Sequence, residues 1–278
     1  MRVEIEHTTR LSYTTDVVES VIDARLGPRS DVHQRWGPYE LRVAPAGAVR
    51  RYSDSFGNIA HLVTLAKPHR AVELTMCGEI ETLLRDPFRL PRDRPQPLAP
   101  GERADYLDPS PLVPRAAEIE RLATPFQGDA ADAFPTAQKL MRLVYDRFGY
   151  VPAVTGVGTT VPEVLAHKTG VCQDFAHVLI ALCRATGIPA RYVSGYIVRD
   201  AGSDAPTRGA GASHAWVEAF TPTHGWRGFD PTNDLVASEH HVKMAVGRDY
   251  RDVPPTQGTF RGAAEESLSV EVLTRILV

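Results

Sequence analysis

One amphipathic segment constrains the fold of this chain more than any other part of the sequence. It spans residues 172–187 and reads CQDFAHVLIALCRATG. Gly187 favours a left-handed C-terminal cap, and Ile188-Pro189 prevents the helix from continuing. The apolar side chains recur at helical spacing and form one stripe, which consists of Phe175, Val178, Leu179 and Leu182. We therefore expect a helix that is buried at the centre of a domain.

Segments of alternating polarity on both sides of this helix predict antiparallel β-structure. Before it, turn signals such as Phe56-Gly57-Asn58 separate alternating segments, as is typical of a sandwich or barrel; they are residues 3–11, 39–43, 59–65 and 72–76. After it, we expect strands at residues 191–198, 214–220 and 226–230. Beyond Pro231 the sequence looks irregular until a last strand that contains Leu268, Val270 and Val272.

Clustered prolines divide the chain. Those between residues 86 and 114 remove so many amide donors that neither a helix nor a central strand is expected there. With 278 residues and 43% hydrophobic content, the chain is long enough for two modest domains. We predict a β-rich N-terminal domain (1–100), a Pro-rich connector with a short helix (101–132) and a core (133–278) whose first helix starts near Pro135. The expected class is α+β, with an antiparallel β-sandwich followed by a helix packed on an antiparallel sheet.

Three chemically useful residues lie at the ends of the predicted core elements. Cys172 opens the central helix, His214 opens a strand and Asp230 closes the next strand. If Phe220 faces Trp226 across the intervening turn, His214 and Asp230 become diagonal neighbours on one face of the hairpin. Their backbones would then lie roughly 7 to 8 Å apart, which allows a hydrogen bond between the imidazole and the carboxylate.

A cysteine, a histidine and an aspartate in this arrangement can supply a nucleophile, a general base and a group that orients the base. The first turn of a helix stabilises a thiolate, so the position of Cys172 favours a reactive thiol. The alternative is a small buried apolar residue, which is what we expect of Cys183 inside the helix. On its own His214 would be an ordinary structural histidine, but its pairing with Asp230 favours catalysis.

Four further residues are candidates for supporting roles. Asp174 would stabilise the helix N-terminus, and Trp216 would pack over the site as an apolar wall. Tyr150 or Gln173 would add a donor for an oxyanion to the backbone amide of Cys172.

Neither a metal nor a cofactor is predicted. Cys172 and His177 lie on different sides of the helix, and Cys183 is displaced roughly 16 Å from Cys172 along its axis. We interpret His240-His241 as a surface pair.

Composition excludes other classes of protein. The formal net charge is −3 and no block of Lys and Arg is present, which argues against a nucleic-acid partner. No apolar run approaches the ~20 residues of a membrane span, and the alternating N-terminal segment does not resemble a secretory signal. Three cysteines in a chain of this length favour free thiols and a cytoplasmic location.

Several motifs resemble one known family. The segments GVCQDFAHVLIALCRATGIPARYVSGY, SHAWVEAF and GWRGFDPTND are similar to the bacterial transglutaminase-like superfamily, whose fold is related to that of papain-like cysteine proteases. GRDYRDVPPTQG at residues 247–258 resembles a downstream signature of the same group. SDSFGN at residues 53–58 resembles the β-rich domain that precedes such cores. The resemblance implies the same three roles for Cys172, His214 and Asp230.

The expected activity is acyl chemistry on amide bonds of a protein or peptide through a thioester on Cys172. Hydrolysis by water and transfer to an amine use the same three residues, and we favour hydrolysis because no water-excluding acceptor channel is evident. Two alternatives stay open, a non-catalytic peptide-binding module of the same fold and a thioester-dependent arylamine acyltransferase. The small-residue segment 200–212 is a candidate lid. The sequence does not predict the oligomeric state.

Overall fold

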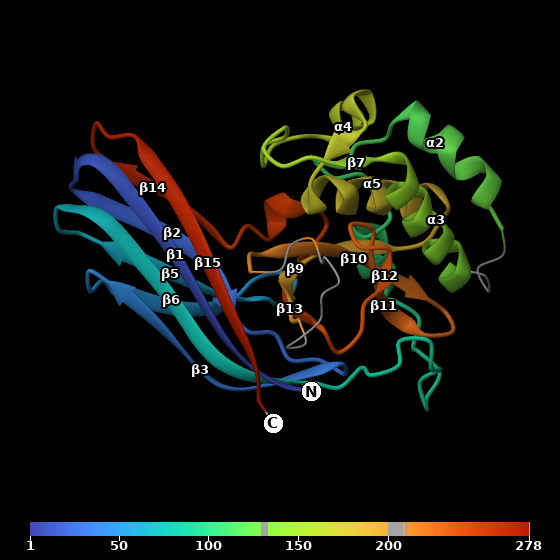
Figure 1. Ribbon diagram of the computed structural model, residues 1–278, viewed down its shortest axis with the longest axis horizontal. Coiled ribbons are helices and arrows are strands. Elements are labelled where there is room, and N and C mark those ends of the chain that lie inside the picture. Colours follow the sequence, from blue (N-terminus) through green and yellow to red (C-terminus); the bar gives the residue numbers. More distant parts are fainter. Residues whose placement is uncertain (129–132, 200–207, 209–210, 278) are drawn as a thin grey trace.

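A computed structural model describes residues 1–128, 133–199, 208 and 211–277. A β-sandwich lies beside a second part in which helices cover an antiparallel sheet (Figure 1). The expected α+β class, with a sandwich followed by a central helix on an antiparallel sheet, is confirmed. Among the described residues, no helix is both long and apolar enough to cross a membrane.

The sandwich consists of two four-stranded antiparallel sheets that share an apolar interior. The first sheet contains, in spatial order, β15 (Glu266–Leu277), β1 (Arg2–Val17), β6 (His69–Thr82) and β3 (Gln34–Ala44). The second contains β14 (Thr256–Arg261), β2 (Glu19–Gly27), β5 (Ile59–Leu65) and β4 (Ala48–Ser53). Alternate residues of β1 face the interior, so Val3 and Ile5 are fully buried while their neighbours are not. The predicted alternation of apolar and polar residues thus places the apolar side chains in the interior of the sandwich.

The last two strands belong to the sandwich. β15 pairs with β1 from Tyr13↔Glu266 to Arg2↔Leu277, and β14 pairs with β2. The strand expected around Val270 therefore forms, but on the edge of the first sheet. The range 133–278 expected for the core includes two strands that the structure places in the sandwich.

The second part is built on a five-stranded antiparallel sheet. Its strands are, in spatial order, β12 (Leu235–Val236), β11 (Gly225–Asp230), β10 (His214–Thr221), β9 (Ala190–Ile197) and β13 (His241–Gly247). The expectation that the chain is irregular beyond Pro231 is wrong, because β13 and β14 form there. Continuous burial along β13 hides the alternation that would have predicted it.

The central helix α5 (Cys172–Ala185) is buried as predicted. The side chains from Phe175 to Leu182 pack into one core with α3 and the α5-facing side chains of β10. Gly187 adopts φ +76° just after the helix, as its left-handed cap requires. The other helices of this part are α2 (Ala117–Ala123), α3 (Ala133–Arg147), α4 (Val161–His167) and the short 3-10 helices η1 (Thr124–Phe126) and η3 (Tyr250–Asp252). A short parallel pair joins β7 (Gly149–Tyr150) to β8 (Thr169–Gly170).

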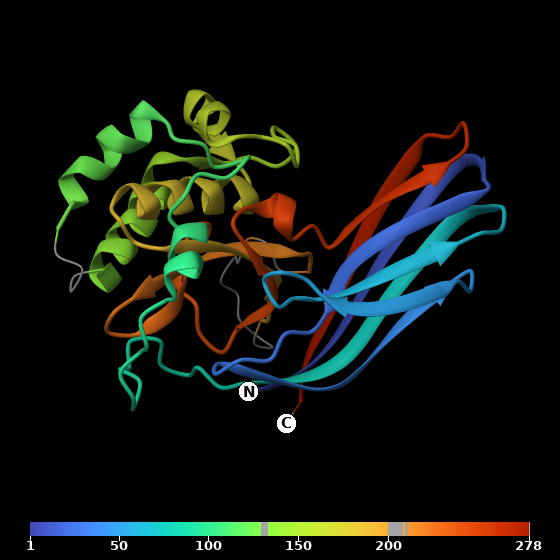
Figure 2. The ribbon, with the colours of Figure 1, turned by 180° about the vertical axis from the view of Figure 1, so that it is seen from behind.

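The Pro-rich connector runs along the lower edge of the molecule and then rises in front of the sheet of the second part in the view of Figure 2. No helix was expected between residues 86 and 114, but α1 (Pro100–Asp105) forms there, because Pro100 occupies the first helical turn, where the missing amide breaks no hydrogen bond of the helix. The short helix expected in the connector is α2. Pro135 likewise lies in the first turn of α3, which begins at Ala133.

The GRDY signature at residues 247–250 has a structural function. Asp249 is fully buried, and its carboxylate accepts hydrogen bonds from the backbone amides of Leu112 and Arg251. The backbone amide of Tyr250 donates to Nε2 of His177 inside α5 at 3.1 Å. Burial lowers the pKa of His177 to about 4, which keeps this ring neutral and able to accept. The signature therefore fastens the chain after β13 to the central helix.

Two side-chain amides join the sandwich to the second part. β13 is an edge strand of its sheet, and its free side meets Gln34 and Asn58. The Gln34 side chain exchanges two hydrogen bonds with the backbone of Lys243, at 2.6 and 2.9 Å. Asn58 does the same with Val246, at 2.8 Å each. Each amide thus satisfies one backbone donor and one acceptor that the edge would leave unpaired.

The pairing of Asn58 with Val246 should therefore contribute measurably to stability. We expect Asn58→Ala to lower the free energy of unfolding by about 1 to 3 kcal/mol, because it leaves a buried backbone amide and carbonyl without partners. Gln257→Ala removes an exposed amide from β14 and should change it by less than about 0.5 kcal/mol. Urea denaturation measures both. Equal effects would show that the Asn58 bridge is not stabilising.

Candidate catalytic site

The β10–β11 hairpin brings His214 and Asp230 together. Phe220 pairs with Trp226 and Val217 with Phe229, so the predicted register is confirmed. Nε2 of His214 lies 2.9 Å from Oδ2 of Asp230, and both side chains are fully buried.

The Asp230 carboxylate is held by the turn that follows it. Its Oδ1 accepts hydrogen bonds from the backbone amides of Thr232 and Asn233, at 2.9 and 3.3 Å. Its Oδ2 accepts one from the side-chain amide of Asn233 at 2.8 Å. Burial alone would raise the pKa of Asp230, but the charge and hydrogen bond of His214 outweigh burial and hold this pKa well below its usual range. Asn233 directly follows the FDPT segment but was not among the residues predicted for the site.

The other ring nitrogen of His214, Nδ1, is buried and has no regular hydrogen-bond partner within the described residues, and the ring lies near the Cys172 thiol. Burial lowers the pKa of His214, but Asp230, with a smaller contribution from the nearby Cys172, outweighs burial and raises it to about 10. The structure thus brings together all three residues that the sequence singled out, with one ring nitrogen directed to the carboxylate and the other available to sulfur.

The N-terminus of α5 fixes the position of Cys172, its first residue. Asp174, two residues further on, accepts hydrogen bonds from the backbone amide of Val171 at 2.8 Å and the hydroxyl of Thr155 at 2.6 Å. A Cβ atom at Gly170 would lie 2.6 Å from this carboxylate, so only glycine fits there. Asp174 therefore caps the helix and ties it to the 151–160 loop, in agreement with its predicted role at the helix N-terminus.

Trp216 covers His214 from the same strand. The two rings stack with centroids 6.1 Å apart and 24° between their planes, and Trp216 is buried. Its indole fits because the neighbouring strand carries Gly195, where a Cβ atom would lie 2.5 Å from the indole and 2.1 Å from the carbonyl oxygen of Val242. The predicted apolar wall is therefore present.

His241 was misinterpreted from the sequence. The adjacent pair was expected at the surface, but His241 is buried at the start of β13. Its Nε2 lies 3.5 Å from Oδ2 of Asp230, and its ring meets Trp216 edge to face at 5.3 Å. Nδ1 accepts a hydrogen bond from the backbone amide of Ser238, which leaves the proton on Nε2 to face the carboxylate. Asp230 therefore faces a second histidine.

Tyr150 and Gln173 lie beside Cys172 in different ways. Tyr150 packs edge to face on Phe175, and the described residues provide no hydrogen bond to its hydroxyl. Burial and the nearby Cys172 raise the pKa of Tyr150. Gln173 donates its side-chain amide to the carbonyl oxygen of Val157 at 3.2 Å. Tyr150 therefore keeps a free donor near the thiol, whereas the amide of Gln173 is engaged.

The surface beside the thiol combines apolar and cationic groups. Val154 and Val157 in the 151–160 loop are 51% and 66% exposed. Arg208 lies over the ring of Tyr150 at 5.1 Å and donates to the backbone of Thr232. The candidate lid at residues 200–212 lies mostly outside the described residues.

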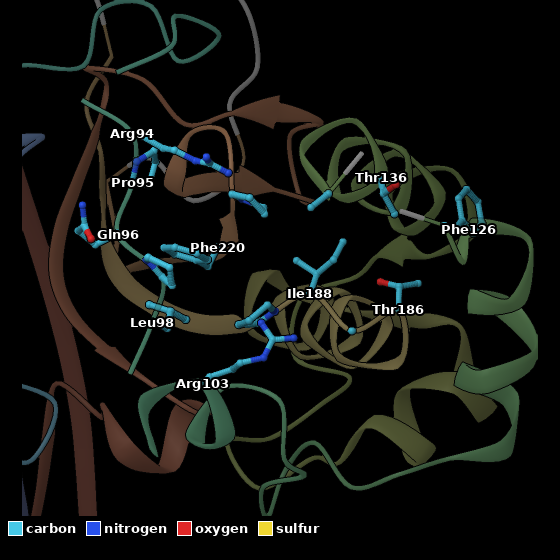
Figure 3. Close-up of a pocket in the computed structure, with 16 residues that line it drawn as sticks. Arg94, Pro95, Gln96, Leu98, Arg103, Phe126, Thr136, Thr186, Ile188 and Phe220 are labelled. Carbon is cyan, nitrogen blue, oxygen red and sulfur yellow. The ribbon is translucent and has the colours of Figure 1, made fainter. Parts of the chain in front are cut away.

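Other candidate groups lie apart from this site. Cys183 is buried inside α5. A cavity of about 590 Å³ is lined by Thr186, Ile188 and Phe220 at the opposite end of α5 (Figure 3), roughly 20 Å from Cys172 for a helix of 14 residues. In the part of the chain that the structure describes, no group of three or more His, Cys, Asp or Glu is arranged to hold a metal ion.

Comparisons with known proteins match both parts of the chain to known families. Residues 120–231 match the transglutaminase-like superfamily, and residues 3–81 match the bacterial transglutaminase-like N-terminal region. An uncharacterised Mycobacterium leprae protein is 34% identical over 99% of both chains, and one from Mycobacterium tuberculosis is 33% identical over 98% of this chain and 92% of its own.

A protein-glutamine gamma-glutamyltransferase of Pseudomonas aeruginosa is 31% identical over 45% of this chain and 20% of its own length. Among solved structures, a candidate cysteine protease from Cytophaga hutchinsonii has the same fold, with a TM-score of 0.78 and 23% identity over 100% of this chain and 92% of that chain. The chain therefore belongs to the transglutaminase-like superfamily and carries the N-terminal region typical of its bacterial members.

Proposed function

We propose that the protein is a cysteine-dependent enzyme that cleaves or exchanges amide bonds of proteins or peptides. The observation that carries this proposal is the environment of His214, which binds Asp230 through Nε2, keeps Nδ1 free of other partners among the described residues and lies near Cys172. A histidine held in this way can take a proton from a thiol and return it to a leaving group. A non-catalytic binding module would not require the buried pair of His214 and Asp230.

The proposed reaction has two steps. The Cys172 sulfur attacks the amide carbonyl carbon while His214 holds the thiol proton. The carbon–nitrogen bond then breaks, His214 gives that proton to the leaving nitrogen, and the acyl group remains on sulfur as a thioester. Water or an amine next attacks the thioester, loses a proton to His214 and releases the sulfur, which recovers the proton.

Substrate selection would use the surface beside the thiol. The exposed side chains of Val154 and Val157 form an apolar surface that suits an apolar side chain of the substrate. Tyr150 offers a hydroxyl donor on the side where Arg208 lies. We favour hydrolysis; amine transfer is the second candidate because one relative is named a glutamyltransferase.

A peptide library tests the reaction directly. We expect cleaved or deamidated products by mass spectrometry, cross-linked ones if a primary amine competes with water, and none with Cys172→Ala. Cys77→Ala, which removes a thiol in the sandwich, should leave the products unchanged. No product from the wild type across varied peptides would contradict the enzyme proposal. Acylation of Cys172 by a cofactor thioester alone would favour the arylamine acyltransferase.

The His214–Asp230 pair predicts a pH dependence. The pKa of His214 rises from 6.5 to about 10 on folding, so the protonated ring stabilises the fold fully below about pH 6.5 and loses this effect as the pH rises through about 10. We expect Asp230→Asn to lower this pKa below 6.5, because burial then dominates. Histidine NMR titration measures both proteins. The wild type should also lose more than about 1.4 kcal/mol of unfolding free energy over this range, the equivalent of one unit, and a normal wild-type titration would contradict the pairing.

His241 is expected to act as a positioning residue through Asp230. His241→Leu should lower the rate of product formation about threefold to tenfold and lower the pKa of His214, because Asp230 loses one of its donors. His241→Gln keeps an amide donor near the position of Nε2 and should restore most of the activity and of the pKa. His240→Leu changes the adjacent, half-buried ring and is the matched control. Equal pH profiles for the wild type and His241→Leu would leave His241 with only a packing role.

A further inference from the structure

A second cavity lies where the sandwich meets the connector, and no residue of the candidate catalytic site lines it. It has a volume of about 1150 Å³ and lies between the β2–β3 loop, the connector after β6 and the turn between β10 and β11. Along β10, the nearby Glu218 is four residues from His214, or about 13 Å. We call this space the cationic cavity, because seven Lys or Arg side chains line it against four carboxylates; the cations are Arg29, Arg85, Arg89, Arg92, Arg191, Arg227 and Lys243.

Two of the cations at its floor are neutralised by carboxylates. Arg191 binds Glu218 through two nitrogens at 2.7 and 2.8 Å. Lys243 contacts Glu218 as well, and lies 2.6 Å from Asp31. These four buried or half-buried groups balance one another in charge.

Two further cations at the floor have no carboxylate partner among the described residues. Arg227 is buried, and its guanidinium donates to backbone carbonyls, including those of Pro87 and Arg89. Arg29 donates to the carbonyl of Phe56, while its Nε is buried without a partner. Buried charges in proteins are ordinarily paired with an opposite charge, so this floor carries an excess of positive charge.

Neighbouring titratable groups lie in the field of these cations. Burial is the main reason that the pKa of His33 is lowered; the charges of Arg227 and Lys243 lower it further, while Glu218 and Asp31 oppose them. Burial likewise lowers the pKa of Arg29, Arg191 adds to this effect, and the same two carboxylates oppose it. Glu218 and Asp31 thus offset part of the positive charge at the floor, but they form their ion pairs with Arg191 and Lys243.

The rim combines the same charge with apolar groups. Arg89 and Arg92 lie on the connector and have no ion-pair partner in the described part of the chain. Val32 and Leu90 line the cavity and are 82% and 62% exposed. The rim can therefore contact an apolar body while guanidinium groups bind an oxyanion.

We propose that the cationic cavity binds a small amphipathic anion, an apolar chain or ring that carries a carboxylate or a phosphate. The buried cations attract the anion, Arg89 and Arg92 donate to its oxygens, and the exposed Val32 and Leu90 cover its apolar part. This binding is separate from the reaction at Cys172 and does not depend on it.

Titration calorimetry on the whole protein tests the proposal with hexyl phosphate, hexanoate, inorganic phosphate and hexanol. We expect one saturable site for the amphipathic anions, weaker binding of inorganic phosphate and none of hexanol. Hexyl phosphate and hexanoate show which headgroup is preferred. Binding should weaken at least tenfold between low and high salt, because exposed charges are screened. Equal binding of hexanol, or no binding of either anion at millimolar concentration, would overturn the proposal.

Variants locate the site. The double variant Arg89→Gln, Arg92→Gln removes two rim charges from exposed positions and should weaken the binding of hexyl phosphate at least tenfold without changing the melting temperature. Arg29→Lys keeps the floor charge and should bind within a fewfold of the wild type. Arg261→Gln removes one exposed charge at the end of β14, across the sandwich (Figure 1), and should bind like the wild type. Unchanged binding by the double variant would place the anion elsewhere and contradict the proposal.

Discussion

The Asp230 carboxylate is the group on which the geometry of the candidate site depends. It receives hydrogen bonds from the turn that follows β11 and faces a histidine from each of two other strands, His214 on β10 and His241 on β13. A buried carboxylate is tolerated only when its oxygens are satisfied, so these groups must all be in place together. The same contacts orient the His214 ring toward the helix N-terminus that carries Cys172. The Asp230 carboxylate, which orients the His214 ring, is thus itself held in place by the strands of the sheet and the turn after β11.

That sheet is supported from outside. β13, which contributes His241, would be an open edge without Gln34 and Asn58. Both side chains come from loops or strand ends of the sandwich, so the SDSFGN segment has a structural role at the edge of this sheet. The GRDY segment fastens the chain after β13 to the backbone of Leu112 through Asp249, and to α5 through the hydrogen bond from Tyr250 to His177. The N-terminal part therefore acts as a brace for the strand behind the candidate site.

Local patterns predicted the features that depend on local physics. The apolar stripe and Gly187 defined α5, and the spacing of His214, Phe220, Trp226 and Asp230 defined the hairpin and its register. Local patterns could not predict which strands pair when they are far apart in the sequence. β13 is buried on both faces and so lacks alternation, which hid His241 beside His240. The pairing of β14 and β15 with β2 and β1 joins residues more than 200 positions apart, and no local signal encodes it. The seven cations of the cationic cavity come from five separate segments, so the cavity has no sequence signature for the same reason.

The return of β15 to β1 has a consequence for the order of assembly. The larger apolar core contains only residues between Val113 and Val253, so it can consolidate by itself. The sandwich, in contrast, needs both β1 and β15, whose pairing closes a loop of more than 250 residues. Contacts of such high sequence separation form slowly, because the entropy of loop closure must be overcome before they stabilise the fold. During synthesis, β1 and β2 would therefore wait for β15 and β14 until after the whole larger core has emerged.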